Sequence, residues 1–293
     1  MKTKTIMITG ANSGIGYQTA LGLAYKKHHV VMICRNAERG QFAQEKIIAE
    51  TGHADVDLII MDLSSQHSIR EGVADFNARY EHLDVLINNA SIFDITQKHI
   101  KLSNDGIETI FATNHLGAFL LTQLLLPSLK MSQAGRIINI ASKGLIAYPF
   151  LDIEFDNLNG EKKFSVAHAY YHSKLAQIMF TFDLADRLGD TNITVNCIRV
   201  PAVQLDEDRF DHIPTFLRGI YRFKMKFSLT STQMAETYLK LSLSPDYKSV
   251  TGAYIDENGK QVKASRKAYN QQTWGKLWDV SEQMTQSTHS LPI

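Results

Sequence analysis

The sequence is short of cysteine and of net charge. Only two of its 293 residues are cysteines, and 31 basic residues stand against 30 acidic ones, for a net charge of +1. A fold held by disulfides needs more cysteines in a much shorter chain, and so small a net charge gives no reason to expect nucleic acid as a partner. Cys34 and Cys197 stand in apolar, strand-like runs without histidines at metal-ligand spacing. We therefore expect two core residues and no metal site.

Long hydrophobic runs are equally scarce. The apolar run at residues 6–8 is too short for a signal peptide. Residues 110–129 contain no Asp, Glu, Lys or Arg and are numerous enough to span a bilayer, but polar side chains and Pro127 interrupt them. We therefore expect a long buried helix, no stable membrane insertion and a cytoplasmic protein.

Two kinds of segment alternate along the chain. Short runs rich in Val, Ile and Leu predict strands at 4–10, 29–35, 56–63, 83–90, 135–141 and 193–200. Helical periodicity lies between them, at about 14–27, 37–51, 66–80, 105–130 and 166–188. This alternation predicts a parallel sheet covered by helices on both faces, and the continuous apolar strands fit burial on both sides. No repeat or linker divides the chain, so we expect one domain.

The first predicted strand leads into a glycine-rich turn, residues 9–16, that reads T-G-A-N-S-G-I-G. Glycines between a strand and a helix let the backbone approach a pyrophosphate, whose charge then meets N–H groups at the helix N-terminus. The spacing G-x-x-x-G-x-G differs from the general dinucleotide fingerprint, and a merely structural turn is the alternative. The residues expected to contact the pyrophosphate are Gly10, Asn12, Ser13, Gly14, Ile15 and Gly16.

The end of the second predicted strand favours NADP over NAD. An NAD site usually has Asp or Glu about 20 residues beyond the glycines to hold the ribose hydroxyls, whereas this chain has Cys34-Arg35-Asn36 there. A guanidinium binds a 2′-phosphate well, and an acid would repel it. Arg39 can assist from the next helix, which Asn36 can cap. The alternative is a solvated arginine at a strand end.

Polar residues also follow the third and fourth predicted strands. Ligands of a doubly wound sheet lie along the carboxyl ends of its strands. There Asp62-Leu63 can meet the adenine, and the asparagines of Asn88-Asn89-Ala90-Ser91 can brace neighbouring strand ends. Taken singly, each is also a common turn former. The cofactor contacts expected here are Asp62, Leu63, Asn89 and Ala90.

The catalytic candidates are Tyr170, Lys174 and Ser142. Tyr170 and Lys174 are four residues apart in a helical segment, so they share one face. A nearby ammonium lowers the pKa of a phenol, which can then exchange a proton near neutral pH. Ser142 ends the fifth predicted strand, at the same sheet edge, where its hydroxyl can hold a carbonyl oxygen. A Tyr/Lys pair alone is more often a surface pair; its occurrence with the glycine turn favours a catalytic role.

Six features follow one another along the chain: the TGANSGIG turn, Asp62, NNAS, the ATNHLGAFLLT segment, Ser142 and the Tyr170–Lys174 spacing. Together they resemble the short-chain dehydrogenases/reductases over about residues 4–260. The resemblance implies a single doubly wound Rossmann-type α/β domain, residues 1–293, with a mostly parallel seven-stranded sheet. It makes Tyr170 the general acid/base, and Ser142 the group that positions the substrate. Lys174 would bind the nicotinamide ribose, and Asn114 would hold a relay water. Tyr171 is excluded because it lies only three residues from Lys174.

Within the family, the chain looks most like the retinol dehydrogenase branch. Ser142 and Tyr170 are 28 residues apart, wider than the common gap, and the intervening FDNLNGEKKFSVAHAYYHSKLAQ and the later VTGAYIDENGK, read as a strand and hairpin, are similar to that branch. Ser91 replaces the usual Gly. The usual Pro-Gly after the sixth strand is missing from residues 199–203, where the resemblance places a nicotinamide contact at Val203. The membrane anchor of many relatives is not seen, so the resemblance does not imply a retinoid substrate.

These patterns predict an NADP(H)-dependent oxidoreductase that transfers a hydride between nicotinamide and an apolar carbonyl or alcohol. The alternatives are a catalytically silent NADP-binding sensor or scaffold, and a reductase of activated C=C bonds. The resemblance implies that residues 203–230 cover the substrate as a lid, and residues 216–227 within them fit both helical and strand periodicity. A surface helix that packs on the core and a membrane-surface segment are the other interpretations. Residues 281–293 are expected to be a polar tail. Family members often pair through their long helices, which suggests a homodimer or homotetramer.

Overall fold

A computed structural model describes residues 2–204 and 228–286. Most of the expected lid, 203–230, and the end of the expected tail therefore lie outside the described residues. Both cysteines are buried, as predicted for core residues.

The core of the molecule is a seven-stranded sheet in the order β3-β2-β1-β4-β5-β6-β7. All pairings between these strands are parallel, which confirms the predicted doubly wound α/β fold. The chain winds outward from β1 in both directions, so the order reverses between β1 and β4, where ligands of such sheets bind. The strands are β1 (Thr5–Thr9), β2 (His29–Cys34), β3 (Val56–Ile60), β4 (Val85–Asn88), β5 (Gly135–Ser142), β6 (Ile193–Val200) and β7 (Ala253–Ile255).

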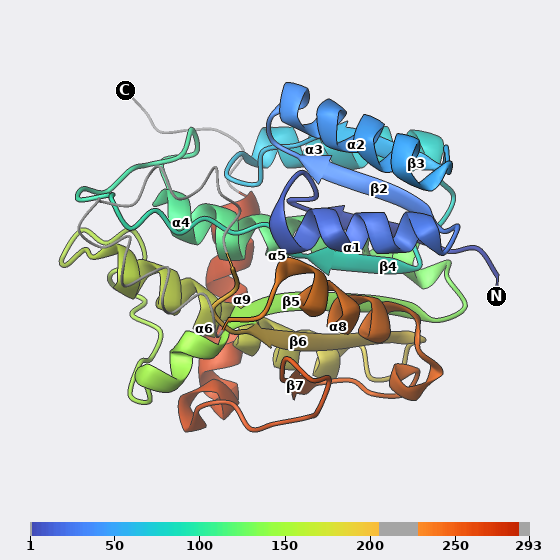
Figure 1. Cartoon of the computed structure of the whole chain (residues 1–293). Coiled ribbons are helices and arrows are strands. Elements are labelled where there is room, and N and C mark those ends of the chain that lie inside the picture. Colours follow the sequence, from blue (N-terminus) through green and yellow to red (C-terminus); the bar gives the residue numbers. More distant parts are fainter. Residues whose placement is uncertain (1, 205–227, 287–293) are drawn as a thin grey trace.

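Helices cover both faces of the sheet (Figure 1). Successive strand residues point to opposite faces, so Ile6 and Ile8 pack in one apolar cluster and Met7 in another. The first cluster joins the sheet to α1 (Gly14–Tyr25), α2 (Ala37–Thr51) and α8 (Ser231–Leu243), and the second joins it to α3 (Gln66–Arg79), α5 (Gly117–Lys130) and α6 (Val166–Arg187). The other helical elements of the described residues are α4 (Thr109–Phe111), η1 (Ala112–Leu116), η2 (Lys143–Ala147), η4 (Pro245–Tyr247), η5 (Arg266–Tyr269) and α9 (Gln271–Gln286).

The residues that the sequence suggested as the start and the end of the second helix have these roles in α2. The Asn36 side chain accepts a hydrogen bond from the Arg39 N–H at 2.9 Å and so caps the helix. Gly52 ends it in the left-handed region, at φ +59°, where glycine has no Cβ to clash. The hairpin expected after β7 is present as well, because Ile255 bridges Gln261 in antiparallel fashion across a turn at Gly259.

The long uncharged segment forms one continuous helical stretch, Thr109–Lys130, that runs through α4, η1 and α5. By length and composition it is the one helix in the described residues that could cross a membrane, and 78% of its apolar window is buried inside the fold. The expectation of a buried helix is therefore confirmed. Its polar interruption, Thr113 to His115, is the π-helical turn η1. Such turns are rare and occur often at functional sites.

The expected polar tail is wrong for residues 281–286, which belong to α9. This helix packs across α6 and α5: Trp278 meets Phe119 edge-on with 5.1 Å between ring centroids, and Arg187 lies 3.9 Å from the Trp278 ring centroid. The buried Ser281 hydroxyl lies 2.9 Å from Nε2 of His115. The apolar residues Trp274, Leu277, Trp278 and Met284 recur at helical spacing in α9, so the sequence carried a helix signal that our prediction did not use. The expected homodimer or homotetramer stays a prediction.

Candidate active site

The glycine turn is too tight for side chains. Gly10 and Gly14 have φ of +67° and +56°, and a Cβ on Gly16 would lie 2.3 Å from the Gly10 carbonyl oxygen. A Cβ on Gly10 would lie 3.1 Å from the Ala90 Cα. The turn therefore brings bare backbone and the N-terminus of α1 to the switch point of the sheet, which is a cradle for a pyrophosphate.

Asparagines after β4 hold this turn in place. The Asn89 amide donates to the Thr9 carbonyl at 2.8 Å, and the Ala90 N–H donates to the Thr9 hydroxyl at 2.8 Å. The Asn88 amide donates to Thr122 at 2.9 Å and to Asn139, on β5, at 2.8 Å. The prediction that an asparagine braces a neighbouring strand end is thus confirmed for Asn89, which holds the end of β1. Asn88, the last residue of β4, binds α5 and the middle of β5 instead.

The other expected cofactor residues lie along the same edge. Arg35 and Arg39 are exposed at the end of β2 and the start of α2. The Asp62 carboxylate, after β3, accepts from the Ser64 N–H at 2.9 Å and the Ser64 hydroxyl at 2.8 Å. The Leu63 side chain is buried in the core. Asp62 therefore shapes its own turn, and the cofactor contacts of Asp62 and Leu63 stay predictions.

Ser142, Tyr170 and Lys174 come together at the carboxyl end of β5. The Lys174 ammonium donates to the Ile140 carbonyl at 2.9 Å and lies 5.7 Å from the centroid of the Tyr170 ring. Ser142 accepts from the Gly144 N–H at 3.2 Å and is hydrogen-bonded to Tyr170. The fold therefore brings together the three side chains that the residue spacing and the strand position predict to be catalytic.

Burial is the largest cause of the pKa shifts of Tyr170 and Lys174. It raises the pKa of Tyr170 to about 12, against which the Ser142 hydrogen bond acts, while Tyr171 raises it further. Burial also lowers the pKa of Lys174 to about 8, with Cys197 opposing. The sequence predicts a lowered pKa for Tyr170, and in this structure the pKa is raised, because burial is the largest cause of its shift.

Asn114 lies in the π-helical turn η1 and is fully buried. Its side chain accepts from the Ile92 N–H at 2.8 Å, and its amide donates to the Ile92 carbonyl and to the Ser173 hydroxyl, both at 3.1 Å. Its main-chain carbonyl accepts from the Gln177 amide at 2.5 Å. Asn114 thus ties the loop after β4 to α6; its role in a water relay stays a prediction.

Aromatic side chains near Tyr170 were missed in the sequence. Phe93 stacks on the Tyr170 ring with 4.3 Å between centroids, and Tyr148 lies 4.4 Å from Tyr171. Their positions in the sequence could have indicated that they lie near the site. Phe93 follows the NNAS segment and Tyr148 follows Ser142, and both segments stand at strand ends of the site.

Residues 199–203, which lack the usual Pro-Gly, are held by contacts of Arg199 and Val203. Arg199, at the end of β6, lies 3.4 Å from the Glu257 carboxylate, which also pairs with Lys143 at 2.5 Å. Val203 forms a parallel bridge with Leu229, just before α8. The hydroxyl of Ser231 at the start of α8 would lie 4.0 Å from a Cβ on Gly14. Val203 is therefore near the start of α8, which approaches the glycine turn; its nicotinamide contact stays a prediction.

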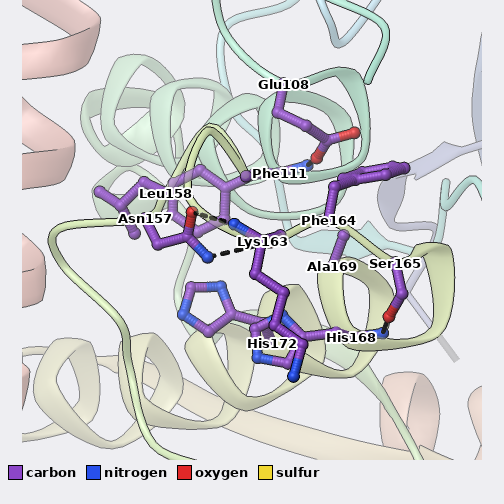
Figure 2. Close-up of a pocket in the computed structure, with 11 residues that line it drawn as sticks. Glu108, Phe111, Asn157, Leu158, Lys163, Phe164, Ser165, His168, Ala169 and His172 are labelled. Atoms are coloured by element: carbon purple, nitrogen blue, oxygen red, sulfur yellow. Dashed lines mark hydrogen bonds between the residues drawn. The ribbon is translucent and has the colours of Figure 1, made fainter. Parts of the chain in front are cut away.

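The wide gap between Ser142 and Tyr170 accommodates a loop that docks on α6. Figure 2 shows the small pocket at this junction, which is lined by Glu108, the loop residue Asn157, and His168 and His172 of α6. The Asn157 amide donates to the Lys163 carbonyl at 3.0 Å. Burial lowers the pKa of His172 to about 4 and raises the pKa of Glu108. In residues 2–204 and 228–286, no group of three His, Cys, Asp or Glu side chains could hold a metal ion.

Comparisons with known proteins agree with this arrangement. The family described as short chain dehydrogenase matches residues 4–151. Retinol dehydrogenase 14 of Homo sapiens is 39% identical over 97% of this chain and 87% of its own length, and retinol dehydrogenase 12 of Mus musculus is 37% identical over 95% and 85%.

Solved structures share the fold. An uncharacterized protein from Mycobacterium Paratuberculosis has a TM-score of 0.72 at 28% identity, over 99% of this chain and 95% of its own. L-Sorbose reductase from Gluconobacter frateurii, solved with NADPH and L-sorbose, has a TM-score of 0.72 at 20% identity over 90% and 98%.

Fold, site and relatives together define an oxidoreductase with a nicotinamide cofactor. The chain belongs to the short-chain dehydrogenase/reductase family, and its relatives include retinol dehydrogenases, as the sequence resemblance predicted.

Proposed function

We propose that this protein is an NADP(H)-dependent oxidoreductase that interconverts a carbonyl and an alcohol on a substrate with an apolar body. The observation that carries the proposal is the meeting of Ser142, Tyr170 and Lys174 at the sheet edge that also holds the glycine turn. A sensor or scaffold without turnover would not need these three side chains in one place.

The side chains suit proton transfer at an oxygen atom. A bound nicotinamide would supply or accept the hydride. Burial keeps the Tyr170 phenol protonated, so in the reducing direction its hydroxyl is a proton donor to the carbonyl oxygen. The Ser142 hydroxyl is placed to hold that oxygen. Lys174, buried beside the phenol, stabilises the phenolate left after donation.

The residues that would hold NADP are the glycine turn for the pyrophosphate and Arg35, with Arg39, for the 2′-phosphate. The fit rests on the bare backbone at Gly16 and on two exposed guanidinium groups at the end of β2. No acidic residue stands at 34–36 to select NAD.

An apolar substrate is supported by the surroundings of Tyr170. Exposed large apolar side chains gather in the loops that follow β4 and β5; among them are Phe93, Ile95, Ile146, Tyr148 and Phe150. The names of the relatives point the same way, because they are described as retinol dehydrogenases.

The deciding experiment is a hydride-transfer assay on the full chain, with NADPH and NADH against a panel of carbonyls and a panel of enones. Carbonyl reduction that prefers NADPH supports the proposal. NADPH binding without turnover on either panel would favour a sensor or scaffold, and turnover of the enones alone would favour a C=C reductase.

The cofactor is tested separately by Arg35→Asp. Loss of a charge-assisted phosphate contact is worth roughly 1.5–3 kcal/mol, so NADPH should bind about 10- to 100-fold more weakly while NADH is little affected. Lys248→Asp is the matched control, because Lys248 is exposed and precedes β7, at the opposite edge of the sheet. Equal affinity of the unmutated protein for NADPH and NADH would refute the assignment of Arg35.

A further inference from the structure

The ring of Phe93 lies on the ring of Tyr170. The centroids are 4.3 Å apart and the planes are inclined by 25°, which is a stacked geometry. Phe93 comes from the loop after β4, and Tyr170 comes from α6, so two separate elements form this pair. Phe93 is 43% exposed and does not belong to the buried core. Because the Phe93 ring is half-exposed and stacks on the Tyr170 phenol, its role is not to fill the core.

A chain of hydrogen bonds, from Ile92 to the Tyr170 carbonyl, holds the loop that carries Phe93 in place. Its neighbour Ile92 is clamped by the Asn114 side chain, which accepts from the Ile92 N–H at 2.8 Å and donates to the Ile92 carbonyl at 3.1 Å. The Asn114 amide also donates to the Ser173 hydroxyl at 3.1 Å, and that hydroxyl donates to the Tyr170 carbonyl at 2.7 Å. The loop that carries Phe93 is therefore fixed to the backbone of Tyr170 itself.

We propose that Phe93 is a positioning residue for the reaction under "Proposed function": its ring covers the face of Tyr170, keeps water from the phenol and fixes the phenol plane toward Ser142. The inference rests on that proposed function. The Asn114 side chain then holds the Phe93 ring against the phenol through its hydrogen bonds to Ile92.

Covering the phenol has a measurable consequence. Burial disfavours the phenolate and raises the pKa of Tyr170 to about 12. The titratable groups around the phenol are Tyr171, Lys174 and Tyr238. Phe93 is uncharged, so shortening it adds or removes no charge among them, although the Tyr171 ring centroid lies 6.4 Å from that of Phe93. A change in the titration of Tyr170 would therefore report the lost cover.

The experiment compares Phe93→Ala, Phe93→Leu and Ile95→Ala in the full chain with saturating NADP(H). Ile95 is the matched control, because it lies in the same loop and is 45% exposed. Measured are kcat and KM as functions of pH, in both directions. In Phe93→Ala, water reaches the phenol and stabilises the phenolate, so the limb assigned to Tyr170 should move by about 0.5–1 pH unit toward acid in both directions, with lower kcat.

Phe93→Leu restores an apolar cover without an aromatic plane, so its pH limb should stay near that of the unmutated protein while kcat remains reduced. Ile95→Ala should leave the limb in place. NADPH affinity should be unchanged in all three variants, which shows that the site is folded. A Phe93→Ala limb that coincides with that of Ile95→Ala would overturn the inference and leave the proposed function standing. An unmutated protein that binds NADPH but turns over no carbonyl or alcohol would overturn both.

Discussion

Acidification from pH 7 to pH 5 should destabilise the protein through His172. This side chain is 4% exposed, and its Nε2 accepts from the Glu154 N–H at 3.0 Å, which only a neutral imidazole can do. Burial lowers the pKa of His172 to about 4, the stacked His168 lowers it further, and Glu154 and Asp152 act against this.

The sign and the size follow from linkage. In the unfolded chain the pKa of a histidine is ~6.5, so between pH 6.5 and 4 the unfolded state binds more protons than the folded state. The stability contributed by neutral His172 is therefore present above pH 6.5 and lost as the pH falls. For a shift from ~6.5 to about 4, the loss between pH 7 and pH 5 is about 2 kcal/mol. His115, whose pKa burial lowers to about 3, adds a loss of similar size.

The assay is denaturant unfolding of the cofactor-free chain at both pH values. His172→Gln keeps an acceptor for the Glu154 N–H but cannot be protonated, so it should lose about 2 kcal/mol less than the unmutated protein between pH 7 and pH 5. His67→Gln is the control, because His67 lies on α3, far in the fold from His172, and its side chain is 81% exposed. If His172→Gln loses as much stability as the unmutated protein, proton uptake at His172 is not the cause.

Three further predictions concern the site and α9. Tyr170→Phe should abolish turnover and leave NADPH binding nearly intact, since only the proton donor is lost; Tyr171→Phe should do much less, and steady-state kinetics with the reverse ranking would contradict the assignment. Gly16→Ala should weaken NADPH binding at least about tenfold, because its Cβ would lie 2.3 Å from the Gly10 carbonyl oxygen; an unchanged Kd would show that the turn is not the cradle. Trp278→Ala should lower the free energy of unfolding by about 3–5 kcal/mol in denaturant melts, whereas a loss below about 1 kcal/mol would mean that α9 is not part of the folded core.

The sheet and the glycine turn were readable from the sequence because their signals are local. Strands buried on both faces are continuous apolar runs, and a turn that cannot hold a Cβ must be glycine, so the strand at 5–9 and the turn at 10–16 could be placed without tertiary information. The Tyr170–Lys174 spacing likewise predicted one helix face, because both residues lie on α6.

What the tertiary structure decided depends on residues far apart in the chain. The pKa of Tyr170 moves upward because burial outweighs the effect of the nearby ammonium, and burial is a property of the packed fold rather than of spacing. The stacking of Phe93 on Tyr170 and the clamp of Asn114 on Ile92 join the loop after β4 to α6 and η1. Helix α9 was not predicted although Trp274, Leu277 and Trp278 recur at helical spacing, whereas the contact of Ser281 with His115 exists only in the folded chain. Sequence alone thus predicted the strands, the glycine turn and the candidate reacting groups, and folding determined their environment, since desolvation and contact exist only once distant segments meet.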